Sequence, residues 1–527
     1  MKQLLSLIVV LLFVSSTTLT AQEIYKEDIV ILFDNDVHGH MEGYAKLSEL
    51  RKEMSRKTPN VCLVSLGDFS QGGAMTSISH GQYAVDIMNL VGYDYIALGN
   101  HEFDYGIEQL AQLTNSLFAK TLTFNFCDSK TRQPVFQPYA IRKLGDMKIG
   151  FIGCVTPVTK FSDAPDSFVD ENDNDIYDFC HGTFYSQLQH YIDEVRAKGA
   201  DLVIVLSHLG DVDSSYETSE DAIHNTHGID IFLDGHAHHV IPSRYVANKK
   251  GDLVLLSSTG AHFANMGRLI ITSERKFKTD LIPVKTYKGE DPTILAAIKR
   301  FRESLNNLPV IAQSDYDLAA FDEEHDTYDR NCQTNLGQLT ADAFRIMGRA
   351  DIGWVNAGGI RNSIHAGNIT YKELLDAFPF ENQICVAEFT GQQIIDALEY
   401  GVSRAPLDNP SYPQVSGMNF NINLNVTSNI LTNATGTFVG IGEGPRRVTN
   451  VRVLNNKTQL YEPIKPEGKY TIASIDFILL KGGCNGMLSN GKIVANDQMM
   501  DTQLIENFLR TYLNGIVDEA YRNYKQQ

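Results

Sequence analysis

The chain has 527 residues, 43% of them hydrophobic and 21% charged, which is ordinary for a globular protein of two domains or more. Its formal net charge of -19 repels a nucleic-acid backbone, so we expect no nucleic-acid polymer as a partner. A small phosphate ester stays compatible with this charge if metal ions supply local positive charge.

The N-terminus has the pattern of a secretory signal peptide over residues 1–21. Lys2 precedes the apolar run LLSLIVVLLFV, and small residues lead to Ala21, where we expect cleavage. An uncleaved anchor is the alternative, but the run is short for a membrane span. We therefore expect a secreted or periplasmic protein without a stable membrane anchor. The sequence does not indicate the oligomeric state.

Seven cysteines are scattered along the chain, and none forms a Cys-x-x-Cys pair. An odd number at wide spacing is not the pattern of a disulfide scaffold. Several of the cysteines stand in apolar stretches and are interpreted as core residues. The sequence alone does not indicate which of them pair.

An apolar, β-branched run that ends abruptly in a polar residue recurs between residues 28 and 272. Near-continuous apolar runs are typical of strands buried on both faces, so we expect a sheet covered by helices. The acidic stretch 160–180 interrupts the pattern; it lacks the glycine and glutamate of a calcium loop and is interpreted as a solvated insertion. The runs are 29–33, 61–66, 95–98, 148–155, 201–206, 229–233 and 252–257, with helices expected at 84–92 and 185–199.

A second unit follows a predicted interdomain helix at 292–308, which begins with Pro and has helical apolar spacing. Its strongest predicted helices are 334–348 and 390–404. The stretch 421–470 is rich in Asn, Thr and Gly and favours strands joined by turns.

Side chains that bind metals stand at the ends of five predicted strands in the first unit. The carboxyl ends of parallel strands are where open α/β sheets bind ligands. In an extended segment, residues two apart point to the same side, so Asp36 and His38 are expected to aim at one ion, as are His236 and His238, while His239 points away. The full set of candidates is Asp36, His38, Asp68, Asn100, His101, Asp104, His208, His236 and His238.

Taken alone, none of these motifs establishes a metal site, although Gly-Asn-His-Glu is moderately informative. A single Asp-x-His is common, and Gly-His-x-His at a strand end also suits a capped loop without a metal. The ordered combination of all five segments favours a metal site.

The motifs DNDVHGH, GDFSQGG, GNHEFDYG, SHLG and GHAHH resemble the signature of the calcineurin-like metallophosphoesterases. Their order and spacing resemble the 5′-nucleotidase family in particular, and the resemblance covers nearly all of the mature chain. It implies an α/β protein: a four-layer α/β/β/α metallophosphoesterase sandwich at 22–288, a linker helix at 289–312, and a C-terminal α+β nucleotide-binding domain at 313–527. It also implies that the domains rotate relative to each other about the linker helix.

The resemblance implies a dinuclear metal centre with a histidine beside it. The ligand types are imidazole, carboxylate and amide without thiolate, which suits two divalent ions, zinc first, with manganese or cobalt as alternatives. His101 is implied to face the phosphoryl group and Asp104 to orient its imidazole; a helix cap is the alternative for Asp104. The implied ligands are Asp36, His38 and His238 for metal one, Asn100, His208 and His236 for metal two, and Asp68 as the bridge.

The second unit resembles the substrate domain of the same family through WVNAGGIR at 354–361. Two arginines are implied to hold the phosphate, because a guanidinium binds oxygen pairs in a bidentate manner. Two phenylalanines are implied to sandwich the base. The alternative for Arg330 is a surface ion pair, and the alternative for Asn356 is a turn residue. The two phenylalanine rings could instead be core residues. The implied substrate-binding residues are Arg330, Asn356, Gly358, Arg361, Phe380 and Phe477.

One position departs from the family pattern. Cys484 stands where relatives have an aspartate that binds the ribose hydroxyls, and a thiol is a poor partner for a diol. Asn485 is the nearest substitute, and Gln333 replaces a glutamate common near the first arginine.

The resemblance implies hydrolysis of nucleoside 5′-monophosphates to nucleoside and phosphate by a dinuclear metal-activated hydroxide. The alternatives are a 2′,3′-cyclic-nucleotide phosphodiesterase or UDP-sugar diphosphatase on the same scaffold. A metal-stabilised nucleotide-binding protein without turnover is the alternative from another class.

Overall fold

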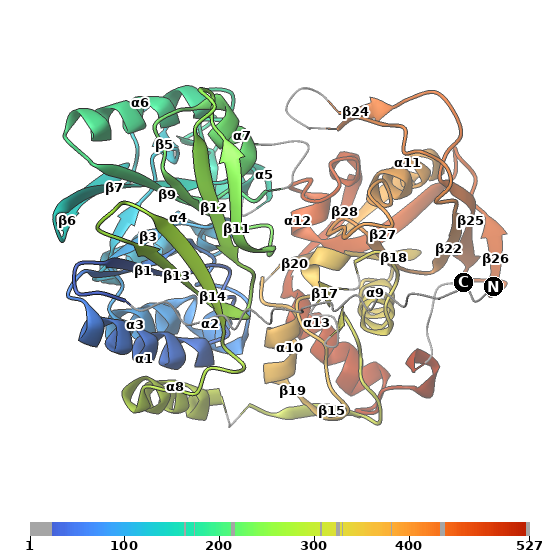
Figure 1. The fold of residues 1–527 in the computed structure, drawn as a ribbon. Coiled ribbons are helices and arrows are strands. Elements are labelled where there is room, and N and C mark those ends of the chain that lie inside the picture. Colours follow the sequence, from blue (N-terminus) through green and yellow to red (C-terminus); the bar gives the residue numbers. More distant parts are fainter. Residues whose placement is uncertain are drawn as a thin grey trace, which may run out of the picture.

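The structure is a computed structural model, which describes residues 24–522 apart from 163–164, 173, 212–216, 306–307, 323–326, 329, 381 and 433–437. The predicted signal peptide, residues 1–21, lies outside the described residues. Among the helices that are described, none combines the length and apolar character that a bilayer crossing requires. Figure 1 shows two units side by side, the first built from the N-terminal half of the chain.

Two six-stranded sheets form the centre of the first unit, in the orders β14-β13-β1-β2-β3-β4 and β11-β12-β10-β9-β7-β6. The first sheet comprises β1 (Ile29–Asp34), β2 (Val61–Ser65), β3 (Tyr95–Ala97), β4 (Lys120–Leu122), β13 (Asn265–Ile271) and β14 (Phe277–Pro283). The second comprises β6 (Tyr139–Leu144), β7 (Met147–Val155), β9 (Leu202–His208), β10 (Ile231–Leu233), β11 (Val240–Ala247) and β12 (Leu253–Thr259). A small ladder pairs β5 (Cys127–Asp128) with β8 (Tyr177–Asp178).

Successive side chains of each strand point to opposite faces of its sheet, and this alternation creates the layers of this unit. On β1, Ile31 and Phe33 belong to the core between the sheets, whereas Val30 and Leu32 belong to the core under helices. Because successive side chains of a strand point to opposite faces, both faces must be covered. The sequence-predicted α/β/β/α arrangement is confirmed (Figure 1). The helices are α1 (Glu42–Lys57), α2 (Ala74–Ser79), α3 (Gln82–Val91), η1 (Asn100–Phe103), α4 (Gly106–Ser116), α5 (Thr159–Ser162), η2 (Pro165–Phe168), α6 (Phe184–Ala197) and α7 (Ser219–Asn225).

Helix α8 (Pro292–Leu305) occupies the range of the predicted linker but packs on the first unit. Ile294 and Ile298 are buried in the same core as α1 and α3. Asp291, just before the helix, accepts hydrogen bonds from Ser48 Oγ at 2.5 Å and from Thr293 N at 3.0 Å. The helix is therefore anchored to the first unit at its N-terminal end, and the predicted domain boundaries and hinge remain predictions.

The second unit is α+β, as predicted, and has one continuous hydrophobic core. Its main sheet has the order β21-β18-β27-β20-β28, and β22-β25-β26 form a smaller sheet. Its strands are β15 (Val310–Ser314), β16 (Phe321–Asp322), β17 (Thr327–Tyr328), β18 (Ile352–Asn356), β19 (Gly367–Thr370), β20 (Gln383–Thr390), β21 (Pro413–Ser416), β22 (Met418–Ile422), β23 (Ile430–Thr432), β24 (Phe438–Ile441), β25 (Val448–Asn455), β26 (Leu460–Pro463), β27 (Lys469–Ile475) and β28 (Lys492–Met500). Its helices are α9 (Asn335–Met347), η3 (Ala357–Gly359), α10 (Tyr371–Ala377), α11 (Gly391–Gly401), α12 (Asp476–Leu479), η4 (Leu488–Asn490), α13 (Asp501–Asn507), η5 (Phe508–Tyr512) and η6 (Glu519–Tyr521).

The two units meet where α10 contacts α2. The side chain of Asp376 in α10 accepts a hydrogen bond from the backbone N–H of Ala74, the first residue of α2. Leu375, the residue before Asp376, is buried in the core of the first unit rather than that of the second. The contact is thus both polar and apolar, and it brings one end of the second unit close to the loops that follow β1 and β2.

The anchoring of α8 can be tested by Ile294→Ala. Because Ile294 is fully buried, its truncation should lower the free energy of unfolding of the first unit by about 2–5 kcal/mol, measured by urea denaturation. Lys299→Ala on the exposed face of the same helix is the matched control and should change stability by no more than about 0.5 kcal/mol. Equal effects of the two substitutions would contradict the packing of α8 on this core.

Candidate active site

The candidate ligands lie on loops at the carboxyl ends of parallel strands in both sheets. Asp36 and His38 follow β1, and Asp68 follows β2. His208 is the last residue of β9, and β10 pairs with β9 in parallel before the loop to His236. Segments distant in sequence thus converge at one edge of the sandwich.

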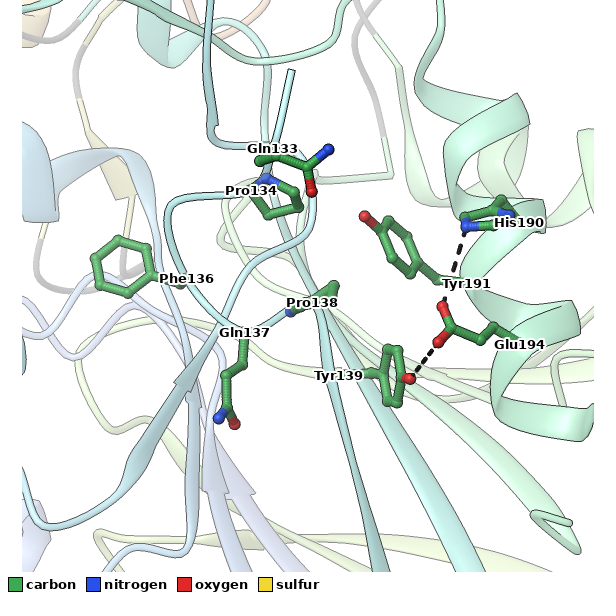
Figure 2. Close-up of a pocket in the computed structure, with 9 residues that line it drawn as sticks. All are labelled: Gln133, Pro134, Phe136, Gln137, Pro138, Tyr139, His190, Tyr191 and Glu194. Carbon is green, nitrogen blue, oxygen red and sulfur yellow. Dashed lines mark hydrogen bonds and ion pairs between the residues drawn. The ribbon is translucent and has the colours of Figure 1, made fainter. Parts of the chain in front are cut away.

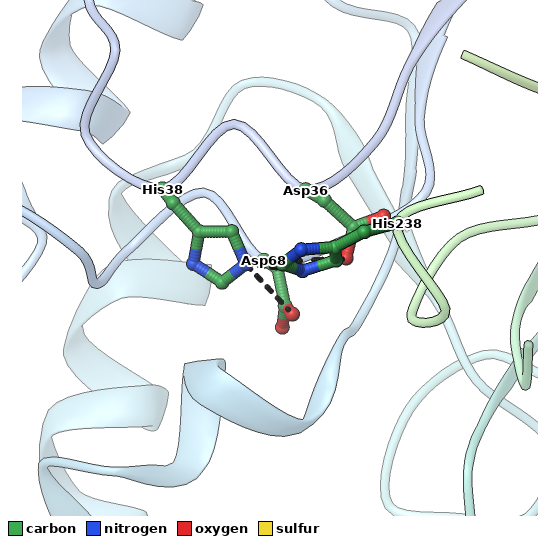
Figure 3. A group of neighbouring side chains, drawn as sticks. All are labelled: Asp36, His38, Asp68 and His238. Carbon is green, nitrogen blue, oxygen red and sulfur yellow. Dashed lines mark hydrogen bonds and ion pairs between the residues drawn. The ribbon is translucent and has the colours of Figure 1, made fainter. Parts of the chain in front are cut away.

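Four of these side chains form a group whose ligand atoms all lie within 4.8 Å of one another (Figure 3). His38 Nε2 lies 3.5 Å from Asp68 Oδ2 and 3.1 Å from His238 Nε2. His238 Nε2 lies 3.3 Å from Asp36 Oδ1. Two carboxylates and two imidazoles around one point are a donor set for a divalent cation.

A second group adjoins the first through Asp68. His208 Nε2 lies 3.0 Å from Asp68 Oδ2, the same oxygen that faces His38. Beside it, His236 Nδ1 lies 3.0 Å from Asn100 Oδ1, and the His208 and His236 rings are 5.3 Å apart at their centroids. The structure thus brings together all seven candidate ligands, with the Asp68 carboxylate between the two groups.

The loops that carry the ligands are not extended. Asp36, His38, His236 and His238 have φ angles of 51°, 45°, 75° and 59°, in the left-handed region that non-glycine residues seldom adopt. The geometric premise that these pairs lie on extended segments is therefore wrong, although the side chains do converge. Tight left-handed turns, rather than the alternation of a strand, aim them inward.

Burial and charge set the protonation of this cluster. Burial alone would raise the pKa of the Asp68 carboxyl, but His208 and the other nearby imidazoles outweigh it and hold that pKa well below its ordinary value. Conversely, burial opposes protonation of His208, but Asp68 and Asp36 outweigh it and raise its pKa to about 10. Burial lowers the pKa of His236 to about 3. Buried carboxylates beside a neutral imidazole suit a cation, which would neutralise the carboxylates.

Sequence reasoning missed Glu102, which organises two of the ligand loops. This buried carboxylate accepts hydrogen bonds from the backbone N–H groups of Asp68 at 2.8 Å and Gly99 at 2.7 Å. The loops touch so closely that a Cβ on Gly99 would lie 2.2 Å from Asp68 Oδ1. In the sequence Glu102 is only an acidic residue within GNHEFDYG, and its burial and its contacts with two loops are seen only in the fold.

Asn35 and His262 were also missed. The Asn35 side chain donates to Asp36 Oδ2 at 2.7 Å and accepts from Thr259 N at 2.9 Å, so it ties the β1 loop to the end of β12. His262 donates its backbone N–H to the carbonyl of Asp36 at 2.7 Å, and its ring centroid lies 5.7 Å from that of His38. The signal for His262 was a histidine shortly after another strand end, the pattern used for the other ligands.

His101 and Asp104 lie beside the ligand cluster. His101 Nδ1 is 2.8 Å from Asp104 Oδ2, and the backbone N–H of His101 donates to Asp68 Oδ1 at 3.0 Å. The rings of His101 and His38 are 5.2 Å apart at their centroids. The dyad is therefore held next to His38 and Asp68, in contact with the candidate ligands.

Two of the predicted substrate residues from the second unit reach this place. The Phe380 ring lies 5.8 Å from the His101 ring, and the Arg361 guanidinium lies 5.7 Å from the Phe380 ring centroid. Arg361 is also close enough to His38 to help lower the pKa of that imidazole, although burial is the larger cause. A cation and an aromatic ring from one unit thus face the ligands of the other.

The remaining predicted substrate residues lie within the second unit. Arg330 is largely buried and lies 3.8 Å from Asp408. Asn356 ends β18, and Gly358 follows in η3. Asn356 Nδ2 is 3.5 Å from the sulfur of Cys484, the residue that departs from the family pattern. Phe477 packs on the core of the second unit and against Gly483, whose Cβ would lie 2.2 Å from its ring.

A separate cavity of about 530 Å³ lies in the first unit, and its lining includes none of the candidate site residues. Figure 2 shows Phe136, Tyr139 and Tyr191 around it, with Glu194 accepting a hydrogen bond from Tyr139 at 2.7 Å. It is formed by the segment before β6 and by α6, away from the strand ends that carry the ligands.

Comparison with known proteins assigns each half of the chain. Residues 29–240 match the calcineurin-like phosphoesterase family, and residues 310–490 match the 5′-nucleotidase C-terminal domain. A 5′-nucleotidase of Vibrio parahaemolyticus is 28% identical over 463 residues, which cover 76% of this chain and 79% of that protein. A trifunctional nucleotide phosphoesterase protein of Bacillus subtilis is 24% identical over 76% of this chain, which spans 29% of that longer protein. The crystal structure of a 5′-nucleotidase precursor from Thermus thermophilus has a TM-score of 0.78 and 25% identity, covering 93% of this chain and 97% of that one.

The sandwich fold and the cluster at its strand ends define a metal-dependent phosphoric ester hydrolase, with a site suited to divalent cations. The chain belongs to the 5′-nucleotidase family, in which a calcineurin-like phosphoesterase domain is followed by a 5′-nucleotidase C-terminal domain. The resemblance in the sequence motifs is thereby confirmed.

The ligand cluster can be tested with two neighbouring histidines. His238→Ala should weaken divalent-metal binding by at least about 100-fold, because even loss of an outer partner of a ligand costs about 10–100-fold. His239→Ala is the matched control: its ring contacts Asp211 at 2.7 Å, so metal affinity should stay unchanged. Both are measured by competition with a metal-binding dye. If the His238→Ala variant binds the metal with wild-type affinity, His238 is not a ligand.

Proposed function

We propose that this protein hydrolyses nucleoside 5′-monophosphates to nucleoside and inorganic phosphate. The observation that carries the proposal is the meeting of Arg361 and Phe380 with His101 beside the ligand cluster. A guanidinium suits the phosphate of a nucleotide and an aromatic ring suits its base. The relatives named 5′-nucleotidase support this assignment. The N-terminal sequence supports a secreted or periplasmic location for the reaction.

The proposed cofactor is a pair of divalent cations, zinc first, with manganese or cobalt as alternatives. The buried carboxylates, the neutral imidazoles and the lack of a thiolate support this choice. When bound, such a pair supplies positive charge to the ester phosphate and lowers the pKa of water at the site. The proposed ligands are Asp36, His38 and His238 for the first ion, Asn100, His208 and His236 for the second, and Asp68 for both.

His101 is the proposed catalytic side chain. Asp104 accepts a hydrogen bond from its Nδ1, which leaves Nε2 to face the phosphoryl group. There the imidazole stabilises the charge that develops on the phosphoryl oxygens or on the leaving oxygen. Asp104 is a positioning residue in this scheme, because its contact is to the imidazole and not to the ester.

The second unit is proposed to bind the rest of the substrate. Arg361 and Arg330 hold phosphate oxygens, and Asn356 contacts the base near the backbone of Gly358. Phe380 and Phe477 are proposed to stack on either side of the base. Phe477 lies against the core of its own unit, so it forms the fixed wall of the base pocket, while Phe380 reaches toward His101.

Cys484, whose sulfur lies 3.5 Å from the Asn356 amide, stands at the position expected to bind the ribose. Two alternative substrates on the same scaffold are therefore retained. Without a carboxylate at this position the ribose hydroxyls lose a strong acceptor, which favours a 2′,3′-cyclic nucleotide, whose hydroxyls are esterified. A UDP-sugar is the other competing substrate on the same scaffold. A metal-stabilised nucleotide-binding protein without turnover is the remaining alternative.

A substrate panel tests the function. Full-length protein loaded with zinc or manganese is given AMP, 2′,3′-cyclic AMP or UDP-glucose, and products are followed by phosphate assay and nucleotide chromatography. We expect the highest kcat/KM for AMP, with Asp68→Asn as the inactive control. Faster turnover of the cyclic nucleotide or of UDP-glucose would replace the proposed substrate. Full metal occupancy without any turnover would establish a binding protein instead.

The role of His101 is tested by His101→Ala and Asp104→Asn. Loss of the imidazole should lower kcat for AMP by about 10²–10⁴-fold while the metal content per chain stays at the wild-type value. Asp104→Asn should lower kcat less than His101→Ala does, because the imidazole remains. His365→Ala, at a largely exposed histidine in the second unit, is the control. Unchanged kcat in the His101 variant would exclude it from the mechanism.

A further inference from the structure

Two cysteines that are far apart in sequence meet in the first unit. Cys127 in β5 and Cys180, two residues beyond β8, have their sulfur atoms 3.3 Å apart, and both side chains are fully buried. The short ladder of β5 and β8 pairs Cys127 with Asp178 and thereby holds the two cysteines next to each other. A disulfide is about 2.05 Å long, so the sulfur atoms need to approach by little more than about 1 Å.

We propose that Cys127 and Cys180 form a disulfide that closes the segment between them into a loop and fixes the core beneath His101. Because the sulfur atoms are already in contact in the folded chain, the bond forms without rearrangement of the two sheets. A secreted or periplasmic location, as the N-terminal sequence supports, provides the oxidising conditions in which such a bond persists.

The two cysteines flank an aromatic core, and this core supports the short helix that carries His101. Phe126 and Phe179 each adjoin one cysteine in sequence, and their ring centroids are 5.1 Å apart. Both pack on Phe103, at 5.0 Å and 5.4 Å. Phe103 is the last residue of η1, the short helix that also carries Asn100 and His101. A covalent bond between the neighbours of Phe126 and Phe179 thus restrains the aromatic cluster on which η1 rests.

A buried asparagine connects the same two segments from the other side. Asn125 donates to the carbonyl of Phe179 at 3.2 Å and to that of Val155 at 2.7 Å, and it accepts from Val155 N at 3.0 Å. The strand β7 is thus tied to both cysteine-bearing segments. The disulfide would add a covalent link to a network that is already hydrogen-bonded.

The cavity shown in Figure 2 adjoins the pair. Tyr191, which lines the cavity, stacks near Phe124 at 5.6 Å, and the carbonyl of Phe124 lies 3.4 Å from the Cys127 sulfur. Burial raises the pKa of Tyr191, and the nearby Cys127 raises it further. Local opening of the two-residue ladder of β5 and β8 would expose the two sulfur atoms to a small disulfide.

The oxidant is a low-molecular-weight disulfide such as oxidised glutathione. The hydrogen bond from Cys127 lowers the pKa of the Cys180 thiol, so Cys180 is the attacking thiolate. It forms a mixed disulfide with one half of the glutathione disulfide and releases the other half as a thiolate, which takes up the proton that Cys180 lost. The Cys127 sulfur then displaces the second glutathione, and its proton goes to that leaving thiol. Two protein thiols are oxidised by two electrons while one glutathione disulfide is reduced to two thiols.

The experiment uses the full chain, first reduced and then equilibrated with oxidised or with reduced glutathione. Peptide mapping by mass spectrometry should find the Cys127 and Cys180 peptides joined, and free thiols should fall from seven to five only in the oxidised sample. The melting temperature of the oxidised form should be about 5–10 °C higher, because the cross-link constrains the unfolded chain. In metal-loaded protein, the oxidised form should also lose activity more slowly on heating.

The double variant Cys127→Ser, Cys180→Ser should abolish the difference in melting temperature between the two glutathione treatments. Cys332→Ser, at an exposed cysteine, should keep it. Should the double variant fail to fold, the peptide map of the wild-type chain decides alone. Free Cys127 and Cys180 after oxidation, or a joined pair without any rise in melting temperature, would overturn the proposal. The peptide map and the melting temperature need no turnover, so a failure of the proposed function would be distinguishable.

Discussion

Two carboxylates without access to water are the constraint on which the first unit depends. Asp36 and Asp68 are essentially unexposed, and moving an unpaired carboxylate out of water costs several kcal/mol. The structure offsets this cost with imidazoles from other loops, above all His208, whose pKa is raised as a consequence. The same arrangement explains the chemistry of the site, because a divalent cation neutralises the carboxylates more completely than a shared proton does.

The candidate ligands hold this geometry because hydrogen bonds and packing from neighbouring segments fix the loops that carry them. Left-handed backbone at non-glycine positions is unfavourable and persists only where the surroundings dictate it. Glu102 and Asn35 provide that support. Glu102 accepts from backbone N–H groups of two loops, and Asn35 binds the Asp36 carboxylate and the backbone N–H of Thr259. Beneath them the aromatic cluster around Phe103 links η1 to the segments of Cys127 and Cys180. Catalytic geometry here rests on buried polar groups and core packing together.

The second unit contributes side chains to the place where the candidate ligands of the first unit converge. Arg361 and Phe380 come within range of His101 because α10 docks on α2, with Leu375 buried in the core of the first unit. Helix α8 packs on the first unit, where Ile294 and Ile298 share a core with α1 and α3. The docking of α10 thus places Arg361 and Phe380 of the second unit beside the candidate ligands of the first.

Apolar runs that end in Asp, His or Asn were enough to predict the strands, a sheet covered by helices and the loops that carry the candidate ligands. The four-layer arrangement was implied by the resemblance of the motifs to a known family. Tertiary structure alone decided how those side chains converge, since left-handed turns replaced the extended geometry expected for Asp36 and His38. It also decided the roles of Glu102 and Asn35 and the contact of Cys127 with Cys180. These depend on hydrogen bonds and packing between segments far apart in the chain, which no local pattern records.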